Sequence, residues 1–299
     1  MHAVIDTDPG HDDALALLLA LGSNRIDVES VTTVAGNARV EATTRNAGRV
    51  LRMAGRSGVP LHQGSDRPME RELTTATVHG EDGLDGMDSR IDPLPAGADA
   101  IDQLADAADR GATIITLGPL TNIARALGTY PDQMRNADRI VSMGGALESP
   151  GNQNRVAEFN MYVDPEAAAT VIGSELDTTL VPLGPCNDII LKPATIPEDC
   201  SIRNELVSLL DPFIRRLREH LDVEGALVYD AIAAFAAAYP EHIETDEHDI
   251  VVETGGEHTR GMLVQEERDY VTAEPTTSVV TRIDEAAFKQ EFRQSLEGL

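Results

Sequence analysis

Short apolar runs rich in β-branched residues alternate with helical patterns along most of this chain. The apolar runs are AVID (3–6), VESVTTVAG (28–36), ATIITLG (112–118), DRIVSMGG (138–145) and TTLVPLG (178–184). The helical patterns between them are DALALLLALG (13–22), ARVEATTRNAGRVLRMAG (38–55), ADAIDQLADAADRG (98–111), PLTNIARALG (119–128) and DPEAAATVIG (164–173). Glycine ends most of the helical segments, and Gly or Pro follows the strands. The alternation predicts an α/β fold: an open, mostly parallel β-sheet flanked by helices.

The last third of the chain is more helical and then returns to strands. Helical patterns occur in IRNELVSLLDPFIRRLREHL (202–221), ALVYDAIAAFAAAYP (226–240) and EAAFKQEFRQSLEGL (285–299). Strand patterns occur in HDIVVETGG (248–256), TRGMLV (259–264) and TTSVVTRID (276–284). No internal repeat, low-complexity tract or linker divides the sequence. We therefore expect residues 1–299 to form a single domain with extra C-terminal helices and strands.

The charge balance restricts the partners of the protein. Asp and Glu number 51 against 24 Lys and Arg, which gives a formal net charge of −27. Nucleic acids and anionic membranes are bound through basic surfaces, so we expect neither as a partner. Lys192 and Lys289 are the only lysines. An acidic, lysine-poor composition resembles proteins of salt-loving microbes, in which concentrated salt screens the self-repulsion, and it predicts a halophilic protein.

Two cysteines, Cys186 and Cys200, are too few for a disulfide framework in a chain of 299 residues. Neither has a partner at metal-ligand spacing, so we expect two reduced thiols. No apolar stretch approaches the length that spans a bilayer. The first strand begins almost at Met1, which leaves no room for a signal peptide. These features predict a cytoplasmic, soluble protein.

Four carboxylates crowd the end of the first strand, in the stretch DTDPGHDDA: Asp6, Asp8, Asp12 and Asp13. In open α/β sheets, ligands bind just beyond the carboxyl ends of the strands. Carboxylates this close together repel, and burying them unpaired is costly. Full solvation, capping of a helix N-terminus, or a bound cation would relieve the repulsion. Helix capping explains one carboxylate, whereas an oxygen-coordinated Ca²⁺ or Mg²⁺ explains the cluster together with the Pro9-Gly10 turn.

Two generic motifs do not fit this stretch. An EF-hand loop needs acidic ligands at alternating positions, a central Gly and a terminal Glu, and that spacing is absent. No GxxxxGK[ST] sequence and no GxGxxG after a strand occurs, which argues against a site that cradles nucleotide phosphates.

The string DTDPGHDDA (6–14) resembles the N-terminal signature of the inosine-uridine nucleoside hydrolase family. Further motifs of that family follow in the same order: TTVAGN (32–37), VHGEDGL (78–84), LGPLTNIA (117–124), MGGAL (143–147), AEFNMYVDPEAA (157–168), YDAIA (229–233) and TRGM (259–262). The resemblance covers nearly the whole chain and implies a Rossmann-like nucleoside hydrolase fold. It implies an N-ribohydrolase, a glycosidase of nucleoside salvage that converts a ribonucleoside and water to ribose and a free base.

The resemblance also implies a Ca²⁺ site at the bottom of the pocket. When the family's motifs are matched to this sequence, the implied metal ligands are Asp8, Asp13, Asp230 and the main-chain carbonyl of Leu117. In the family the metal also contacts the ribose 2′- and 3′-hydroxyls and a water. Ca²⁺ accepts six to eight oxygen ligands in irregular geometry, which suits this set. Asp8 would double as the general base that takes a proton from the attacking water.

The same carry-over assigns the sugar site. Asp12 would hold the ribose 2′-hydroxyl, and the other substrate-binding positions would be Asn37, Asn152, Glu158, Phe159 and Asn160. Carboxylates and amide oxygens around the sugar would stabilise an oxocarbenium-like transition state. Taken without the motif, Asn37 would be read as a turn residue, Glu158 and Asn160 as surface residues, and Phe159 as core.

The chain departs from the family pattern at the leaving base. Members that accept inosine and uridine usually carry His before the last Asp as a proton donor, and here that residue is Tyr229. Tyrosine has a pKa near ~10 and is a weaker acid than imidazole. We therefore take Tyr229 and His79 as the candidate catalytic residues at the base; the role of His11 stays open. A second departure is LGPCND (183–188), where relatives often carry an Asp and a His.

Two alternatives to a nucleoside hydrolase remain at this stage. One is a ribonucleoside-binding protein that kept the Ca²⁺ pocket but lost efficient catalysis with the change to Tyr229. The other is a Mg²⁺-dependent phosphohydrolase of the haloacid dehalogenase type, which also has D-x-D after its first strand. That group needs Thr or Val two residues after the second Asp, where this chain has Gly10. Because family members are commonly oligomeric, the resemblance also implies a homodimer or homotetramer.

Overall fold

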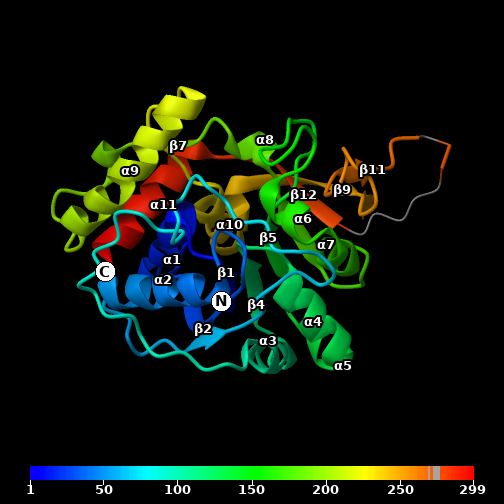
Figure 1. Cartoon of the computed structure of the whole chain (residues 1–299), viewed down its shortest axis with the longest axis horizontal. Helices are drawn as coiled ribbons and strands as arrows, with labels where there is room; N and C mark the ends of the chain where they lie inside the picture. The colour runs from blue at the N-terminus through cyan, green and yellow to red at the C-terminus, as the bar shows by residue number, and fades with distance from the viewer. Residues whose placement is uncertain (269, 272–276) are drawn as a thin grey trace.

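The computed structural model describes residues 1–268, 270–271 and 277–299. Its centre is an eight-stranded sheet in the order β3-β2-β1-β4-β5-β6-β12-β9 (Figure 1). The strands are β1 (His2–Thr7), β2 (Asp27–Thr33), β3 (Leu61–Gln63), β4 (Thr113–Thr116), β5 (Ile140–Met143), β6 (Thr178–Val181), β9 (Ile243–His248) and β12 (Thr277–Ile283). All neighbouring strands pair in parallel except β9, which lies antiparallel to β12 at one edge. The predicted α/β fold is confirmed.

Helices cover both faces of the sheet, because residues of each strand alternate between two buried cores. Ile5 and Ile115 face one core, whereas Val4 and Ile114 face the other. The first core is closed by α1 (His11–Gly22), α2 (Val40–Met53), α9 (Arg203–Leu221), α10 (Tyr229–Ala238) and α11 (Glu285–Glu297). The second is closed by α3 (Ala100–Asp109), α4 (Thr121–Thr129), α5 (Pro131–Met134) and α7 (Pro165–Ile172). Figure 1 shows these two helical layers on opposite sides of the strands.

Small elements complete the chain outside the main sheet. The hairpin β10 (Ile250–Val252) and β11 (Leu263–Gln265) packs on α7, and β7 (Ile190–Leu191) pairs with β8 (Ala226–Leu227). Two short helices, α6 (Phe159–Val163) and α8 (Leu183–Cys186), follow the ends of β5 and β6. Both cysteines are free and buried, as expected. Among the described residues, no helix is long and apolar enough to cross a membrane.

Several predicted boundaries differ from the structure. Strands β3 and β9 were not predicted, and the strands predicted at 248–256 and 259–264 shrink to the short hairpin β10–β11. The helix predicted over 226–240 begins only at Tyr229, because Ala226 and Leu227 pair with β7. Residue 276 of the last predicted strand lies outside the described residues.

The strand order places the site at one edge of the sheet. Strand β1 lies between β2 and β4, and the chain runs outward from β1 in both directions. At such a switch point the loops after neighbouring strands turn to opposite faces and leave a crevice at the carboxyl ends. The loops that follow β1, β2, β4 and β5 carry most of the residues selected from the sequence.

Candidate active site

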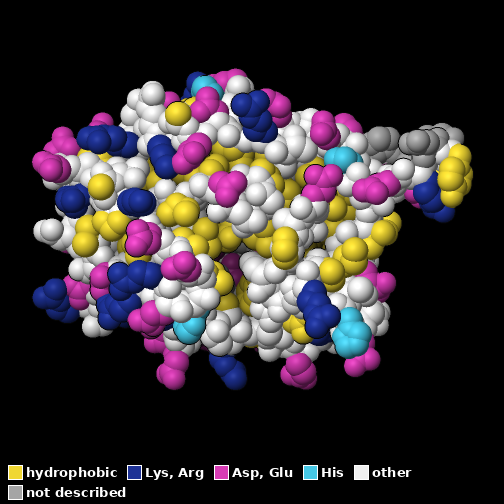
Figure 2. All heavy atoms as spheres, turned by 90° about the horizontal axis from the view of Figure 1, so that it is seen from above, with side chains coloured by type: hydrophobic (Ala, Val, Ile, Leu, Met, Phe, Trp, Pro, Cys, Tyr) yellow, Lys and Arg dark blue, Asp and Glu magenta, His cyan; other side chains and the backbone are white. Residues whose placement is uncertain are grey.

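A cavity of about 330 Å³ opens at the carboxyl ends of the parallel strands. Figure 2 shows the hollow on this face, with an acidic side chain at its floor and hydrophobic side chains around it. Of the residues selected from the sequence, the cavity is lined by Asp12, Asn37, His79, Leu117, Asn152, Glu158, Phe159, Asn160, Tyr229 and Asp230. The other two, Asp8 and Asp13, are fully buried just beneath it. The fold therefore gathers the whole predicted set in one place.

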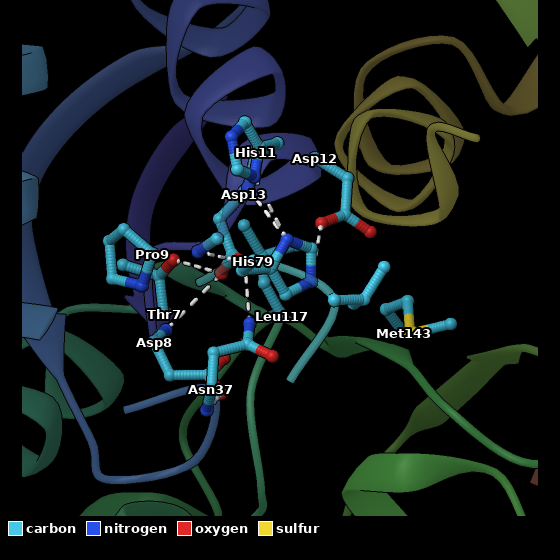
Figure 3. A network of polar contacts seen from close by, with 12 residues as sticks. Thr7, Asp8, Pro9, His11, Asp12, Asp13, Asn37, His79, Leu117 and Met143 are labelled. Atoms are coloured by element: carbon cyan, nitrogen blue, oxygen red, sulfur yellow. Dashed lines mark hydrogen bonds and ion pairs between the residues drawn. The ribbon is translucent and has the colours of Figure 1, made fainter. Parts of the chain in front are cut away.

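Asp13 is the carboxylate of the cluster that accepts the most hydrogen bonds in the described structure. Its Oδ1 accepts hydrogen bonds from the hydroxyl of Thr7 (2.6 Å) and the backbone N–H of Asp8 (3.2 Å). Its Oδ2 accepts from the backbone N–H of Gly10 (2.9 Å) and from Nδ2 of Asn37 (3.2 Å). Asp13 thus ties the β1–α1 turn to the loop after β2, and Figure 3 shows it between these partners. Its position at the N-terminus of α1 further favours a negative charge.

Asp8 is held from one side only. Its Oδ2 accepts the backbone N–H of Asn37 at 2.6 Å, whereas its Oδ1 is buried and has no hydrogen-bond partner among the described residues. Two glycines make room for it: a Cβ at Gly36 would lie 2.1 Å from Oδ2, and one at Gly118 would lie 2.5 Å from Oδ1. A buried carboxylate oxygen without a donor is an expensive arrangement, so Asp8 Oδ1 is free for a ligand.

The site can hold a cation. Asp12 and Asp13 in the first turn of α1 and Asp230 in the first turn of α10 each offer an oxygen, and these oxygens lie within 4.8 Å of one another. Oδ1 of Asp12 is a second buried oxygen with no hydrogen-bond partner in the described part of the chain. A hard cation accepts this all-oxygen donor set. The three oxygens that lie close together thus include one from Asp12, whereas the resemblance selected Asp8 as a ligand. The carboxylate of Asp8, with its free Oδ1, is buried beneath the cavity.

The electrostatics of the carboxylates agree with this interpretation. Burial, with the Asp13 carboxylate beside it, raises the pKa of Asp12 to about 8. Burial and then the neighbouring acids raise the pKa of Asp8 and of Asp230 well above the usual range. Without a cation, burial and the neighbouring acids therefore disfavour the ionised form of each of these groups. A bound divalent charge would reverse the preference, because it favours the ionised form of each ligand.

Asp6, the fourth acid of the opening stretch, plays a structural part. Its Oδ1 accepts hydrogen bonds from the hydroxyl of Thr32 (2.6 Å) and from Nδ2 of Asn122 (2.7 Å). Burial raises its pKa to about 7, and these two hydrogen bonds oppose the rise. Asp6 therefore links β1 to β2 and α4 below the cavity.

Four of the predicted sugar-binding residues lie on the wall formed after β5: Asn152, Glu158, Phe159 and Asn160. Glu158 is buried and accepts three backbone N–H groups, from Gly145 (3.1 Å), Asn160 (2.8 Å) and Met161 (3.2 Å). Nδ2 of Asn160 donates to the carbonyl oxygen of Leu117 at 2.7 Å. Glu158 and Asn160 are therefore buried and fixed, not surface residues. The half-buried Phe159 and the exposed Asn152 reach the cavity nearer its mouth.

His79 faces the acidic cluster from the other wall (Figure 3). Its Nδ1 is engaged on the side away from the cavity, 3.3 Å from the backbone nitrogen of His11 and 3.1 Å from Nδ1 of the His11 ring. That nitrogen lies 3.7 Å from Oδ1 of Asp12. Burial first, and the nearby His11 ring second, lower the pKa of His79 well below its usual range. His79 therefore presents a neutral imidazole whose Nε2 is directed at the cavity.

Tyr229 lines the same cavity, but its hydroxyl already has a hydrogen-bond partner. Its hydroxyl donates to Oδ1 of Asn187 at 3.0 Å, so its only proton is engaged by a residue of the LGPCND stretch. Burial, followed by the charge of Asp12, raises the pKa of Tyr229 above its usual value. The two departures from the family pattern thus contact each other. Both features make this hydroxyl a weaker acid than a free tyrosine.

One wall of the cavity was not anticipated from the sequence. Phe213, Leu217 and Leu221 of α9 line it, and the segment 75–78 lines the cavity as well. The three side chains are spaced by four residues and form one helical stripe, which a sequence pattern does not distinguish from a core-facing stripe. They make this part of the cavity apolar.

The chain is similar to known proteins over nearly its whole length. The sequence model described as inosine-uridine preferring nucleoside hydrolase matches residues 3–290. The chain is 37% identical over 305 residues to the pyrimidine-specific ribonucleoside hydrolase RihA of Shewanella woodyi, covering 98% of this chain and 97% of that one. It is 38% identical over 287 residues to RihA of Photobacterium profundum, covering 93% and 92%.

Solved structures give the same family. The plant nucleoside hydrolase PpNRh1 superposes with a TM-score of 0.91 at 28% identity, covering 99% of this chain and 98% of its own. The purine-preferring ribonucleoside hydrolase from Gardnerella vaginalis superposes with a TM-score of 0.92 at 26% identity, covering 100% and 98%. The predicted enzyme class, a nucleoside N-ribohydrolase with a nucleoside substrate, is confirmed. The chain belongs to the inosine-uridine preferring nucleoside hydrolase family.

Proposed function

We propose that this enzyme hydrolyses the N-glycosidic bond of ribonucleosides with Ca²⁺ as its cofactor and Asp8 as the general base. The observation that carries the proposal is the buried carboxylate cluster at the cavity floor. It contains two buried oxygens, on Asp8 and Asp12, that lack a hydrogen-bond partner among the described residues, beside a wall that carries Glu158 and Asn160. An unpaired acidic cluster of this kind is stable only when a cation or a proton neutralises it.

Asp8, Asp13, Asp230 and the carbonyl of Leu117 would hold the cation, with Asp12 at its edge. When bound, Ca²⁺ supplies positive charge that orients a ribose diol and makes a nearby water easier to deprotonate. Asp8 Oδ1 then accepts the proton of the attacking water, because it is a buried oxygen without a donor of its own. The hydrogen bond from Asn37 N–H to Oδ2 fixes the orientation of the Asp8 carboxylate for this transfer.

The remaining acids act on the sugar. Asp12 and Glu158 lie at the cavity surface, and their negative charge favours a ribose ring that becomes cationic as the bond to the base breaks. Glu158 is held by three backbone N–H groups, so it keeps its place without reorganisation. Asn37, Asn152 and Asn160 supply further polar contacts to the sugar.

His79 is our choice for the proton donor to the leaving base, in preference to Tyr229. Protonated His79 would carry an acidic proton on Nε2, which faces the cavity, and donating that proton to the base would return the neutral imidazole, whereas the Tyr229 hydroxyl donates to Asn187. We expect His79→Asn to lower kcat by about 10²- to 10³-fold, the usual contribution of a general acid. Tyr229→Phe is expected to lower kcat by less than about 10-fold. Steady-state rates of base release compare the two, and the reverse ranking would assign the role to Tyr229.

A base-release assay tests the proposed function itself. Inosine, adenosine, guanosine, uridine and cytidine are supplied with Ca²⁺ in molar KCl, which suits the acidic composition. The assay includes both base classes, since the names of the relatives include pyrimidine-specific and purine-preferring enzymes. We expect equal amounts of ribose and base. Tight nucleoside binding by calorimetry without base release would favour the alternative, a Ca²⁺-dependent ribonucleoside-binding protein.

A further inference from the structure

The base-facing end of the cavity is built from two walls that are distant in sequence. One wall is the segment 75–79, which ends in His79, and the other is the apolar stripe of α9. Neither wall belongs to the sheet, so something must fix the distance between them. The contacts of Arg216, on α9 between Phe213 and Leu217, provide that connection.

Arg216 contacts the His79 segment at two points. Its Nη1 donates to the carbonyl oxygen of Val78 at 2.5 Å, and its Nη2 forms an ion pair with the carboxylate of Asp85. Val78 directly precedes His79 in the chain. Asp85 closes the same loop, because its backbone N–H donates to the carbonyl oxygen of His79 at 3.1 Å. The guanidinium group therefore holds the loop at Val78, before His79, and at Asp85, after it.

The loop is also fixed on its inner side. Nε2 of His11 donates to the carbonyl oxygen of Asp85 at 2.8 Å, so Asp85 is held by α1 as well as by α9. The His11 ring stacks on Phe213 with centroids 4.7 Å apart, and the His79 ring stacks on Phe213 at 5.3 Å. The Gly10 backbone approaches the His79 ring so closely that a Cβ there would lie 2.9 Å from it. The imidazole of His79 has little freedom once Arg216 holds the loop against α9.

We propose that Arg216, acting through Val78 and Asp85, is a positioning residue that sets the imidazole of His79 against the leaving base. The proposal rests on the proposed function, since it concerns the reaction at the same cavity. Arg216 does not line the cavity and so does not touch the substrate itself. Its effect is expected on substrates whose departing group depends on His79, and not on the sugar or the cation.

Two ribosides separate this role from a general structural one. A nucleoside base departs poorly as an anion, whereas 4-nitrophenolate departs well without a proton. For Arg216→Met we expect kcat/KM for nucleosides to fall about 10- to 100-fold, as a displaced catalytic group commonly causes. For 4-nitrophenyl β-D-ribofuranoside we expect the change to stay within about threefold. Equal losses on both substrates, or no loss on either, would overturn the proposal.

A matched control lies next to Arg216 in the chain. Arg215 is on the same helix, but its side chain points to solvent and pairs with Asp211. Arg215→Met makes the same chemical change and should leave both ribosides at wild-type rates. A double variant, Arg216→Met with Asp85→Asn, should be no worse than Arg216→Met alone, since the two residues act as one unit. Additive losses would contradict the linkage through Asp85.

A measurement independent of turnover keeps the proposal testable if the proposed function fails. The imidazole signals of His79 are assigned in the Ca²⁺-loaded protein by ¹H–¹⁵N NMR, using His79→Gln to identify them. Arg216→Met should shift or broaden these signals, whereas Arg215→Met should not. Unchanged His79 signals in Arg216→Met would overturn the inference. Absence of base release by the wild-type enzyme would instead count only against the proposed function.

Discussion

Replacing Asp8 by Asn is expected to lower kcat/KM for every nucleoside by about 10³- to 10⁴-fold. The amide is nearly isosteric but cannot accept the proton of the attacking water, and it is a poorer ligand for a divalent cation. The loss should appear mainly in kcat, because the sugar contacts of Asp12, Asn37 and Glu158 do not depend on Asp8. Initial rates of base release at saturating Ca²⁺ measure it.

The stability of the same variant serves as its control. Asp8 is fully buried beside Asp6 and Asp13, so the neutral amide removes like-charge repulsion from the cation-free protein. In EDTA, Asp8→Asn should therefore melt no lower than wild type. Asp132→Asn, at a carboxylate with 97% exposure that pairs only with Arg135 in the described structure, should leave both activity and melting unchanged. Activity of Asp8→Asn within about tenfold of wild type would contradict the assigned role.

The second large effect concerns the cation and pH together. The folded pKa of Asp12, about 8, lies above the value of an exposed carboxyl. A group whose pKa is raised on folding contributes stability at low pH and loses it as pH rises through the folded value. The cation-free protein should therefore become less stable between pH 4 and pH 8. Ca²⁺ should offset this loss, because it stabilises the ionised carboxylates of Asp8, Asp12 and Asp230.

Differential scanning fluorimetry at pH 5 and pH 8, with EDTA or CaCl₂ at constant ionic strength, measures the effect. A ligand at 100 times its Kd stabilises the folded state by about 2.7 kcal/mol. We expect the gain in Tm from Ca²⁺ to be larger at pH 8 than at pH 5, and activity to vanish in EDTA and return with Ca²⁺. An equal gain at both pH values, or full activity in EDTA, would contradict a carboxylate-held cofactor.

Residues at the floor of the cavity could be selected from the sequence, whereas the wall formed by α9 could not. Asp8, Asn37 and Leu117 each follow a strand, so the parallel sheet alone brings them to one edge. Asp230 comes from a distant helix and could be selected only through the resemblance. The role of the Phe213 stripe was missed, because a residue that lines a cavity has the same periodicity as one that faces a core.

The contacts of Arg216 and the strand β9 could not be predicted for related reasons. Arg216 and Asp85 are 131 residues apart, and no local pattern marks such a pair. Strand β9 lies at the sheet edge, and its residues from Glu244 to Glu247 are exposed, so it lacks the apolar alternation that signals a strand. Both features depend on tertiary neighbours and not on local propensity.

The order of strands also determines when each strand can pair during synthesis. Strand β12 lies between β6 and β9, so during synthesis on the ribosome the edge of β6 stays unpaired until β12 emerges. Open strand edges invite wrong pairing between nascent chains. Helix α11 follows β12 and packs on α1. The helix that carries Asp12 and Asp13 is therefore translated well before the helix that covers it.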